Sequence, residues 1–146
     1  MTKGQSNVHG RLGGGAFQRG QMSAAQRSYA SAADLAEESG DTGSTIYAEL
    51  GLGDVSSATG KFKEAREHYQ TALDLSRSID ARTTEAEALS GLGDVARKQN
   101  DKTAAIEHYR GAMELYAFFK NDTRVAELLE MMDELGAKPS PEGPEN

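Results

Sequence analysis

The residues of this chain best suited to metal chemistry are its three histidines. His68 and His108 recur forty residues apart, and His9 stands alone. A protein metal site needs at least a third donor and carboxylates that orient the imidazole rings. Glu67 and Glu107 adjoin two of the histidines in sequence, but neighbouring residues on a helix point in different directions. We therefore predict no metal site, and a repeat in the sequence explains why the histidines recur.

Other familiar constellations for catalysis or cofactor binding are also missing from the sequence. Gly13-Gly14-Gly15 has the composition of a phosphate-binding loop, but the chain lacks the G-x-x-x-x-G-K-[ST] pattern. No Ser/His/Asp grouping can be assembled from the spacing, and acidic pairs such as Glu37-Glu38 are typical of a solvated helix surface. We predict that the protein is not an enzyme and has no cofactor.

The elements that carry these residues follow from an internal repeat. Ala48-Glu-Leu-Gly-Leu-Gly-Asp-Val55 returns as Ala88-Leu-Ser-Gly-Leu-Gly-Asp-Val95, and a weaker copy lies upstream around Leu12 and Gly13. The same step of forty residues relates six further pairs downstream: Ala65 and Ala105, Glu67 and Glu107, His68 and His108, Tyr69 and Tyr109, Ala72 and Ala112, and Leu75 and Leu115. Matches at a fixed step of this length indicate stacked structural repeats.

Apolar residues at three- and four-residue steps predict helices throughout the repeats. The predicted ranges are about 6–19, 22–39, 44–59, 62–79, 84–99, 102–120 and 123–135. The predicted buried faces include Ala25, Tyr29, Ala32 and Leu35 in the second helix; Phe62, Ala65, Tyr69, Ala72 and Leu75 in the fourth; and Val125, Leu128, Leu129 and Met132 in the last.

The turns between these helices carry recognisable capping residues. We expect Asp41 or Thr42, and later Asp122, to cap the helices that follow them. Gly60 and its counterpart Asn100 are expected to adopt a left-handed conformation after a helix. Phe118 and Phe119 are interpreted as core or closing-helix packing, with one of the two partly exposed, because consecutive residues cannot both face inward.

The spacing of the small and bulky residues resembles that of the tetratricopeptide repeat family. The matching residues are Leu12-Gly13, Ala16, Ala25, Tyr29 and Ala32; Leu52-Gly53, Ala65, Tyr69 and Ala72; and Leu92-Gly93, Ala96, Ala105, Tyr109 and Ala112. In such a repeat, Gly53 and Gly93 would let crossing helices approach, and Tyr69 and Tyr109 would fill the space between them. Glu49, in place of Leu89, departs from the pattern and is expected to loosen the second repeat.

The resemblance implies an all-α superhelix, a right-handed solenoid of three helix-turn-helix repeats and a capping helix. The expected units are 6–41, 42–81 and 82–121, with the cap at 122–136. Residues 1–5 are expected to form a flexible N-terminus and residues 137–146 a disordered, proline-containing tail. The step of forty residues, rather than the usual thirty-four, is similar to the lengthened variety of kinesin light chains, Pins-type adaptors and bacterial regulators.

Charge and composition argue against some classes of partner. The formal net charge is −7, whereas nucleic-acid binders concentrate Lys and Arg on one face. We therefore expect no nucleic acid and no membrane surface as partner. The chain has no cysteine, so no disulfide can form, and no signal peptide is visible. We interpret it as cytoplasmic, and its Ala, Gly, Arg and Asp content favours a bacterial source.

The resemblance further implies that the first helix of each repeat lines a concave groove that binds a peptide or helix of a partner protein. The expected groove residues are Phe17, Gln18, Tyr47, Leu50, Asp54, Ser57, Glu87, Ser90, Asp94, Arg97 and Lys98. This surface favours a peptide with a basic and an apolar contact. Some family members bind a C-terminal carboxylate with groups at positions that include those of Asp54 and Asp94. Because these aspartates would repel a carboxylate, we expect acidic tail peptides not to bind.

A rival hypothesis is structural self-association. No polar outer face is evident for the first repeat, and its apolar residues Leu12, Ala16 and Phe17 could pair with a second copy of the chain. The sequence does not identify the partner, and it does not decide between these two functions.

Overall fold

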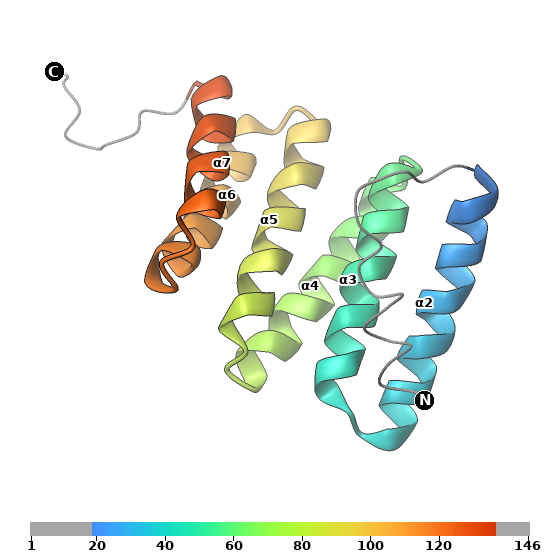
Figure 1. Ribbon diagram of the computed structural model, residues 1–146. Coiled ribbons are helices and arrows are strands. Elements are labelled where there is room, and N and C mark those ends of the chain that lie inside the picture. Colours follow the sequence, from blue (N-terminus) through green and yellow to red (C-terminus); the bar gives the residue numbers. More distant parts are fainter. Residues whose placement is uncertain (1–18, 137–146) are drawn as a thin grey trace, which may run out of the picture.

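The computed structural model describes residues 19–136, which form six helices (Figure 1). Their bounds are α2 Arg19–Ser39, α3 Thr42–Ala58, α4 Phe62–Ser78, α5 Arg82–Lys98, α6 Lys102–Phe118 and α7 Asp122–Glu134. Each helix lies within three residues of its predicted range. The helix predicted at 6–19 and the tail predicted from 137 lie outside the described residues.

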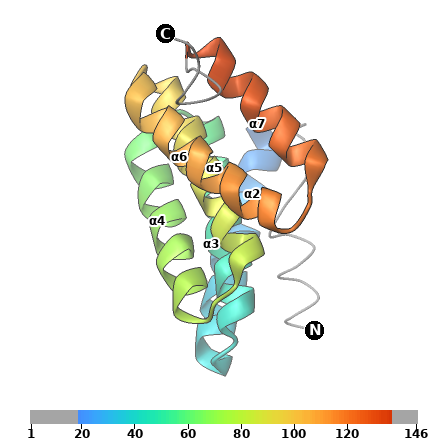
Figure 2. The same cartoon turned by 90° about the vertical axis from the view of Figure 1, so that its left-hand side faces the viewer.

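The helices repeat with a shift of forty residues. Thr42–Ala58 becomes Arg82–Lys98, and Phe62–Ser78 becomes Lys102–Phe118, so both helices of the pair keep their length. Each helix packs against the next in the chain, and α3 also packs against α5. The result is an all-helical stack of the α-solenoid type, which Figure 2 shows from the end that carries α6 and α7. None of the helices in the described part is long and apolar enough to cross a membrane.

The turns between the helices recur every twenty residues, which is half the shift that relates the helix pairs. Gly40, Gly60, Asp80, Asn100 and Lys120, twenty residues apart, all have positive φ, between 57° and 81°. This confirms the left-handed conformation predicted for Gly60 and Asn100. Asp80 and Lys120 take the same conformation without being glycine or asparagine, which sequence reasoning did not anticipate.

Side-chain caps begin three of the helices. Asp41 accepts a hydrogen bond from the Ser44 amide and caps α3, as one of the two predicted candidates. Asp101 caps α6 through the Ala104 amide. The cap of α7 is Asn121, whose side chain accepts from the Arg124 amide. The prediction of Asp122 was wrong by one residue, because both side chains can accept such a bond and the helix begins one residue earlier than expected.

The core is thin and depends on tyrosines that lie against glycines. A Cβ atom on Gly53 or Gly91 would lie 2.7 or 2.5 Å from the Tyr69 ring, and one on Gly93 would lie 2.5 Å from the Tyr109 ring. Tyr69 therefore fits between its own repeat's first helix and that of the next repeat. The glycines make room for an aromatic ring as much as for a close approach of two backbones.

Three predictions of apolar packing need correction. Leu35 is 40% exposed and Leu129 37% exposed, whereas the neighbouring Ala36 and Leu128 are fully buried. In α2 the buried stripe ends at Ala36 instead of Leu35, and in α7 it includes Leu128 and Met132 but not Leu129, because only one side of each helix faces its neighbour. Phe118 and Phe119 are both exposed, at 64% and 42%, so neither is a core residue.

Candidate binding surface on the first helices of the repeats

The first helices of successive repeats, α3 and α5, form one layer of the stack. Their backbones approach each other, with Cα atoms within 8 Å, whereas no Cα atoms of α4 and α6, the second helices of the same repeats, come that close within the described residues. Lys98 Nζ donates to Ser57 Oγ at 3.1 Å and links the ends of α5 and α3. This bond joins two of the predicted groove residues across the two helices.

The two repeated aspartates bind tyrosines of the second helices. The Tyr69 hydroxyl donates to Asp54 Oδ1, and the Tyr109 hydroxyl donates to Asp94 Oδ1 at 2.5 Å. Both aspartates are half-buried. Each therefore has a structural role that sequence reasoning missed, in addition to any role in binding. The repeated Asp-Tyr spacing of fifteen residues was the signal that could have revealed it.

In the third repeat a cation joins this pair. Arg97 Nε donates to the Tyr109 hydroxyl at 3.1 Å, and its Nη2 lies 3.6 Å from Asp94 Oδ1. The hydrogen bond to Tyr109 and the nearby Asp94 charge raise the pKa of Arg97. Burial and the hydrogen bond to Asp94 raise the pKa of Tyr109 well above its usual range. The guanidinium therefore stays charged and the hydroxyl stays protonated at any ordinary pH.

The remaining predicted groove residues differ in how much surface they offer. Leu50 is fully buried and belongs to the main core cluster, and Ser57 and Ser90 are 7% exposed. The Ser90 hydroxyl is buried without a hydrogen-bond partner. Tyr47 and Glu87 are half-buried, and Arg97 and Lys98 are exposed. Phe17 and Gln18 lie outside the described residues, as do Leu12 and Ala16 of the self-association hypothesis.

A second polar pair lies between the helices of the second repeat. His68 Nδ1 is 2.8 Å from Glu49 Oε1, and the two side chains are 32% and 18% exposed. Glu49, which departs from the usual apolar residue, therefore has a partner on α4. The described residues contain no cluster of three or more potential metal ligands, so this pair is a contact between two helices.

In the third repeat the corresponding residues are Leu89 and His108. Leu89 is 8% exposed and would lie 3.4 Å from a Cβ atom on Gly111 of α6. Burial lowers the pKa of His108, and the charges of Glu107 and Asp101 oppose this shift only in part.

A comparison with protein families agrees with this geometry. The tetratricopeptide repeat model matches residues 4–78 and again residues 44–117, so the two matches together span most of the chain. The chain belongs to the tetratricopeptide repeat family. A search of curated proteins found no significant match. Tetratricopeptide repeats generally mediate protein–protein interaction, and a protein partner is therefore the class of ligand to consider for this tetratricopeptide repeat protein.

Proposed function

We propose that this tetratricopeptide repeat protein is a non-enzymatic, cytoplasmic interaction module that binds a peptide or helical segment of a partner across α3 and α5. The observation that carries the proposal is the contact between these first helices where the second helices have none. A stack bends toward the layer in which neighbouring helices touch, so the first helices lie on the inner side of the curve. An extended inner surface accommodates a segment rather than a globular domain.

The charge on this surface determines which segments of a partner protein it favours. Asp54, Glu87 and Asp94 are all partly exposed on the two helices, and Asp94 retains 39% of its side-chain surface. Asp94 is partly neutralised by Arg97, whereas the residue corresponding to Arg97 in the second repeat is Ser57. The partly exposed carboxylates of Asp54, Glu87 and Asp94 favour a lysine or arginine of the partner.

Tyr47 supplies the apolar contact. It is half-buried and packs against the main core cluster beside Leu50. A partly buried tyrosine offers a rigid ring with little loss of side-chain entropy on binding. The preferred ligand on this proposal is a peptide with a basic residue for the carboxylates and an apolar residue for Tyr47. Peptides that end in several acidic residues should show no measurable binding.

The test uses charge removal that leaves the fold intact. Asp54→Asn combined with Asp94→Asn keeps an acceptor oxygen for each tyrosine hydroxyl and removes two negative charges. Peptides selected from a random library for binding to the wild-type chain should lose about tenfold or more in affinity, measured by calorimetry, because a close charge pair contributes on the order of 1.5 kcal/mol or more.

Glu67→Gln combined with Glu107→Gln is the matched control. Both glutamates are exposed on the second helices α4 and α6, and this variant changes the net charge by the same amount. Its peptide affinity should equal that of the wild type. Equal losses in the two variants would mean that only the overall charge matters, and retained affinity in the aspartate variant would refute binding at α3 and α5.

A further inference from the structure

The inner layer of first helices is not evenly spaced along the stack. In chain order α3, α5 and α7 follow one another across the molecule (Figure 1). Cα atoms of α3 and α5 lie within 8 Å of each other, but no Cα atoms of α5 and α7 come that close within the described residues. The junction between α5 and α7 is therefore wider than the junction between α3 and α5.

The repeat identifies the side chains of α5 at the wider junction. Lys98 of α5 bonds Ser57 of α3, so the side of α3 that carries Ser57 faces α5. Leu50 lies seven residues earlier, two turns away on the same side of the helix. The counterparts of Ser57 and Leu50 on α5 are Arg97 and Ser90, and their side of α5 therefore faces α7.

The same shift explains why α7 lies further away. Gly91 is on the side of α5 that carries Lys98, and a Cβ atom there would lie 2.5 Å from the Tyr69 ring. The counterpart of Gly91 on α7 is Met131. A methionine cannot approach the Tyr109 ring as closely as Gly91 approaches the Tyr69 ring, so α7 cannot pack in the position that α5 has in its own repeat.

The Ser90 side chain at this junction has an unpaired hydroxyl. Ser90 is 7% exposed, and its Oγ atom is buried without a hydrogen-bond partner. Its counterpart Leu50 is fully buried in the main core cluster, so the closed junction between α3 and α5 has an apolar side chain where the wider one has a hydroxyl. Because an unpaired buried hydroxyl is costly, this position favours a ligand group that can bond it.

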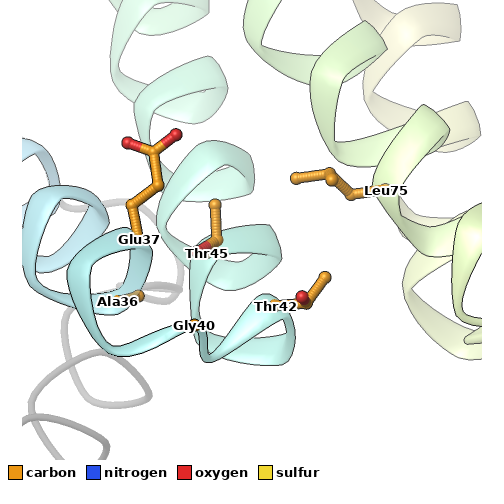
Figure 3. A pocket seen from close by; sticks show the side chains of 6 residues that line it. All are labelled: Ala36, Glu37, Gly40, Thr42, Thr45 and Leu75. Atoms are coloured by element: carbon orange, nitrogen blue, oxygen red, sulfur yellow. The ribbon is translucent and has the colours of Figure 1, made fainter.

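A surface hollow beside the turn from α2 to α3 lacks such a group. Figure 3 shows its lining residues, which include Thr45 and Leu75. The Thr45 hydroxyl donates to the Asp41 carbonyl oxygen at 3.1 Å. Among the described residues, neither buried polar atom without a hydrogen bond belongs to this lining, so the hollow gives no comparable indication of a ligand.

The side of α7 that faces α5 is acidic. Glu127, Glu130 and Glu134 are exposed and lie three and four residues apart, on one side of the helix. Met131 lies on the same side, seven residues being two turns from Glu127 to Glu134. Glu130 and Glu134 make no ion pair with any described residue, so their charges remain available to a cation.

The cations of the junction already have partners. Arg97 donates to the Tyr109 hydroxyl and lies 3.6 Å from Asp94. Arg124 donates to Glu127 and lies over the Tyr116 ring. The charges that remain without an opposite charge are carboxylates, and they favour a positively charged group of the ligand.

We propose that a basic side chain of the bound segment enters between α5 and α7, donates a hydrogen bond to the Ser90 hydroxyl and lies beside Glu130 and Glu134. This inference rests on the proposed function, because it extends the segment bound across α3 and α5 as far as α7. The unbranched Met131 side chain can move aside to admit the ligand, since methionine adapts its shape readily. Both an ammonium and a guanidinium have the donor that Ser90 requires.

The first test removes the hydroxyl without adding volume. Peptides selected from a random library for binding to the wild-type chain should bind Ser90→Ala about tenfold more weakly in calorimetry, because a hydrogen bond to a charged group is lost. The urea midpoint of the free chain should stay the same or rise, because no hydrogen bond within the chain is lost.

Ser76→Ala is the matched control. Ser76 is also buried, but its hydroxyl is 2.7 Å from that of Thr84. This variant should show the opposite pattern, a lower urea midpoint and an unchanged peptide affinity. A lower urea midpoint for Ser90→Ala would mean that its hydroxyl has a partner within the folded chain, and it would overturn the inference.

A double-mutant cycle identifies the side chain that enters. Each lysine or arginine of a selected peptide is replaced in turn by norleucine. One replacement should weaken binding about tenfold against the wild-type chain and much less against Ser90→Ala. If every replacement had the same effect against both chains, no basic side chain would bond Ser90, and the inference would be wrong.

The carboxylates of α7 provide an independent test. Glu130→Gln combined with Glu134→Gln should weaken binding about threefold, as expected for exposed charges, whereas Glu67→Gln with Glu107→Gln should have no effect. Unchanged affinity in Ser90→Ala, with a loss in the Asp54→Asn, Asp94→Asn variant, would refute only the contact at Ser90. The reverse result would refute the site across α3 and α5, and a chain that binds no peptide would overturn both proposals.

Discussion

The second and third repeats share one framework but differ in what lies between their helices. In both, a tyrosine of the second helix packs against glycine and donates to an aspartate of the first helix. Where the second repeat places the Glu49–His68 pair, the third has Leu89 and a partly buried His108. The second repeat has Ser57 at the position where the third repeat has Arg97, which donates a hydrogen bond to the Tyr109 hydroxyl.

This difference separates the positions that hold the helices together from those that vary. The glycine, tyrosine and aspartate positions cannot change independently, since the ring needs the space and the hydroxyl needs its acceptor. The position of Glu49 and Leu89 accepts either chemistry, although the corresponding residue of the second helix is a histidine in both repeats, His68 and His108. Exchanging residues between the two repeats tests which positions belong to which class.

The largest effect is expected when the third repeat receives the residue of the second. Leu89→Glu should lower the free energy of unfolding by about 3 kcal/mol, because it removes a buried leucine that lies near Gly111 of α6. Pairing of the new carboxylate with His108 would not make up this loss, since burial disfavours the charged form of His108 and lowers its pKa. Urea unfolding at pH 7 measures the change. The reciprocal Glu49→Leu is the control and should change stability by less than about 1 kcal/mol, since the partly exposed Glu49–His68 contact that it removes contributes little. Equal effects of the two exchanges would contradict the distinction.

Much of this framework could be predicted from the sequence. The forty-residue period and the spacing of small residues predicted the bounds of every described helix to within three residues. The period is informative because a repeat that cannot bury its own apolar face must stack on a copy of itself. The pairing of Glu49 with His68 could not be predicted in the same way, and the repeated fifteen-residue spacing was the only sign of the pairing of Asp94 with Tyr109. Such contacts depend on how far one helix is rotated against the next, and that rotation is fixed by packing rather than by spacing along either helix.

The groove residues show the same limit. Spacing assigned Leu50, Ser57 and Ser90 to the surface that a partner would touch, yet all three are buried. The inner faces of α3 and α5 also contact each other, and a periodic pattern cannot tell a residue in that contact from one beside it. One of Phe118 and Phe119 was expected to be partly exposed, but the exposure of both was missed for the converse reason, since large apolar residues are assigned to the core by default.

The second prediction concerns the shared framework. Gly93→Ala should lower the free energy of unfolding by about 2 kcal/mol, because its Cβ atom would lie 2.5 Å from a Tyr109 ring that Asp94 and Arg97 hold in place. Gly53→Ala should have a similar effect at Tyr69. Gly43→Ala is the matched control, because its Cβ atom would meet only Asp41 at 3.7 Å, and alanine favours the helix. Denaturant unfolding of the three variants should therefore show two losses and no loss at Gly43.

The third prediction uses pH to separate the two histidines. Burial lowers the pKa of His108 in the folded chain below the value of about 6.5 expected when the chain is unfolded. Between these two pKa values the unfolded chain binds more protons, so stability falls as the pH drops below about 6.5 and levels off below the folded-state pKa. His108→Gln should remove this part of the pH dependence, measured by urea unfolding between pH 5 and 8. The His68→Gln chain keeps His108 and must keep that part. A His108→Gln chain with an unchanged pH profile would contradict the assignment.

The smallest effect is expected at the turns, where the repeats also differ. Lys120 takes a left-handed conformation with φ 59°, as Gly60 does at the equivalent twenty-residue step with φ 81°. A residue with a Cβ atom pays roughly 1 kcal/mol in this conformation, and the greater freedom of glycine in the unfolded chain offsets part of that cost. Lys120→Gly should therefore raise the free energy of unfolding by about 0.5 kcal/mol. Asn100→Gly should gain less, because asparagine tolerates the same conformation better than lysine does. If both variants gained equally, the contribution would come from glycine itself, and the turns would not distinguish the repeats.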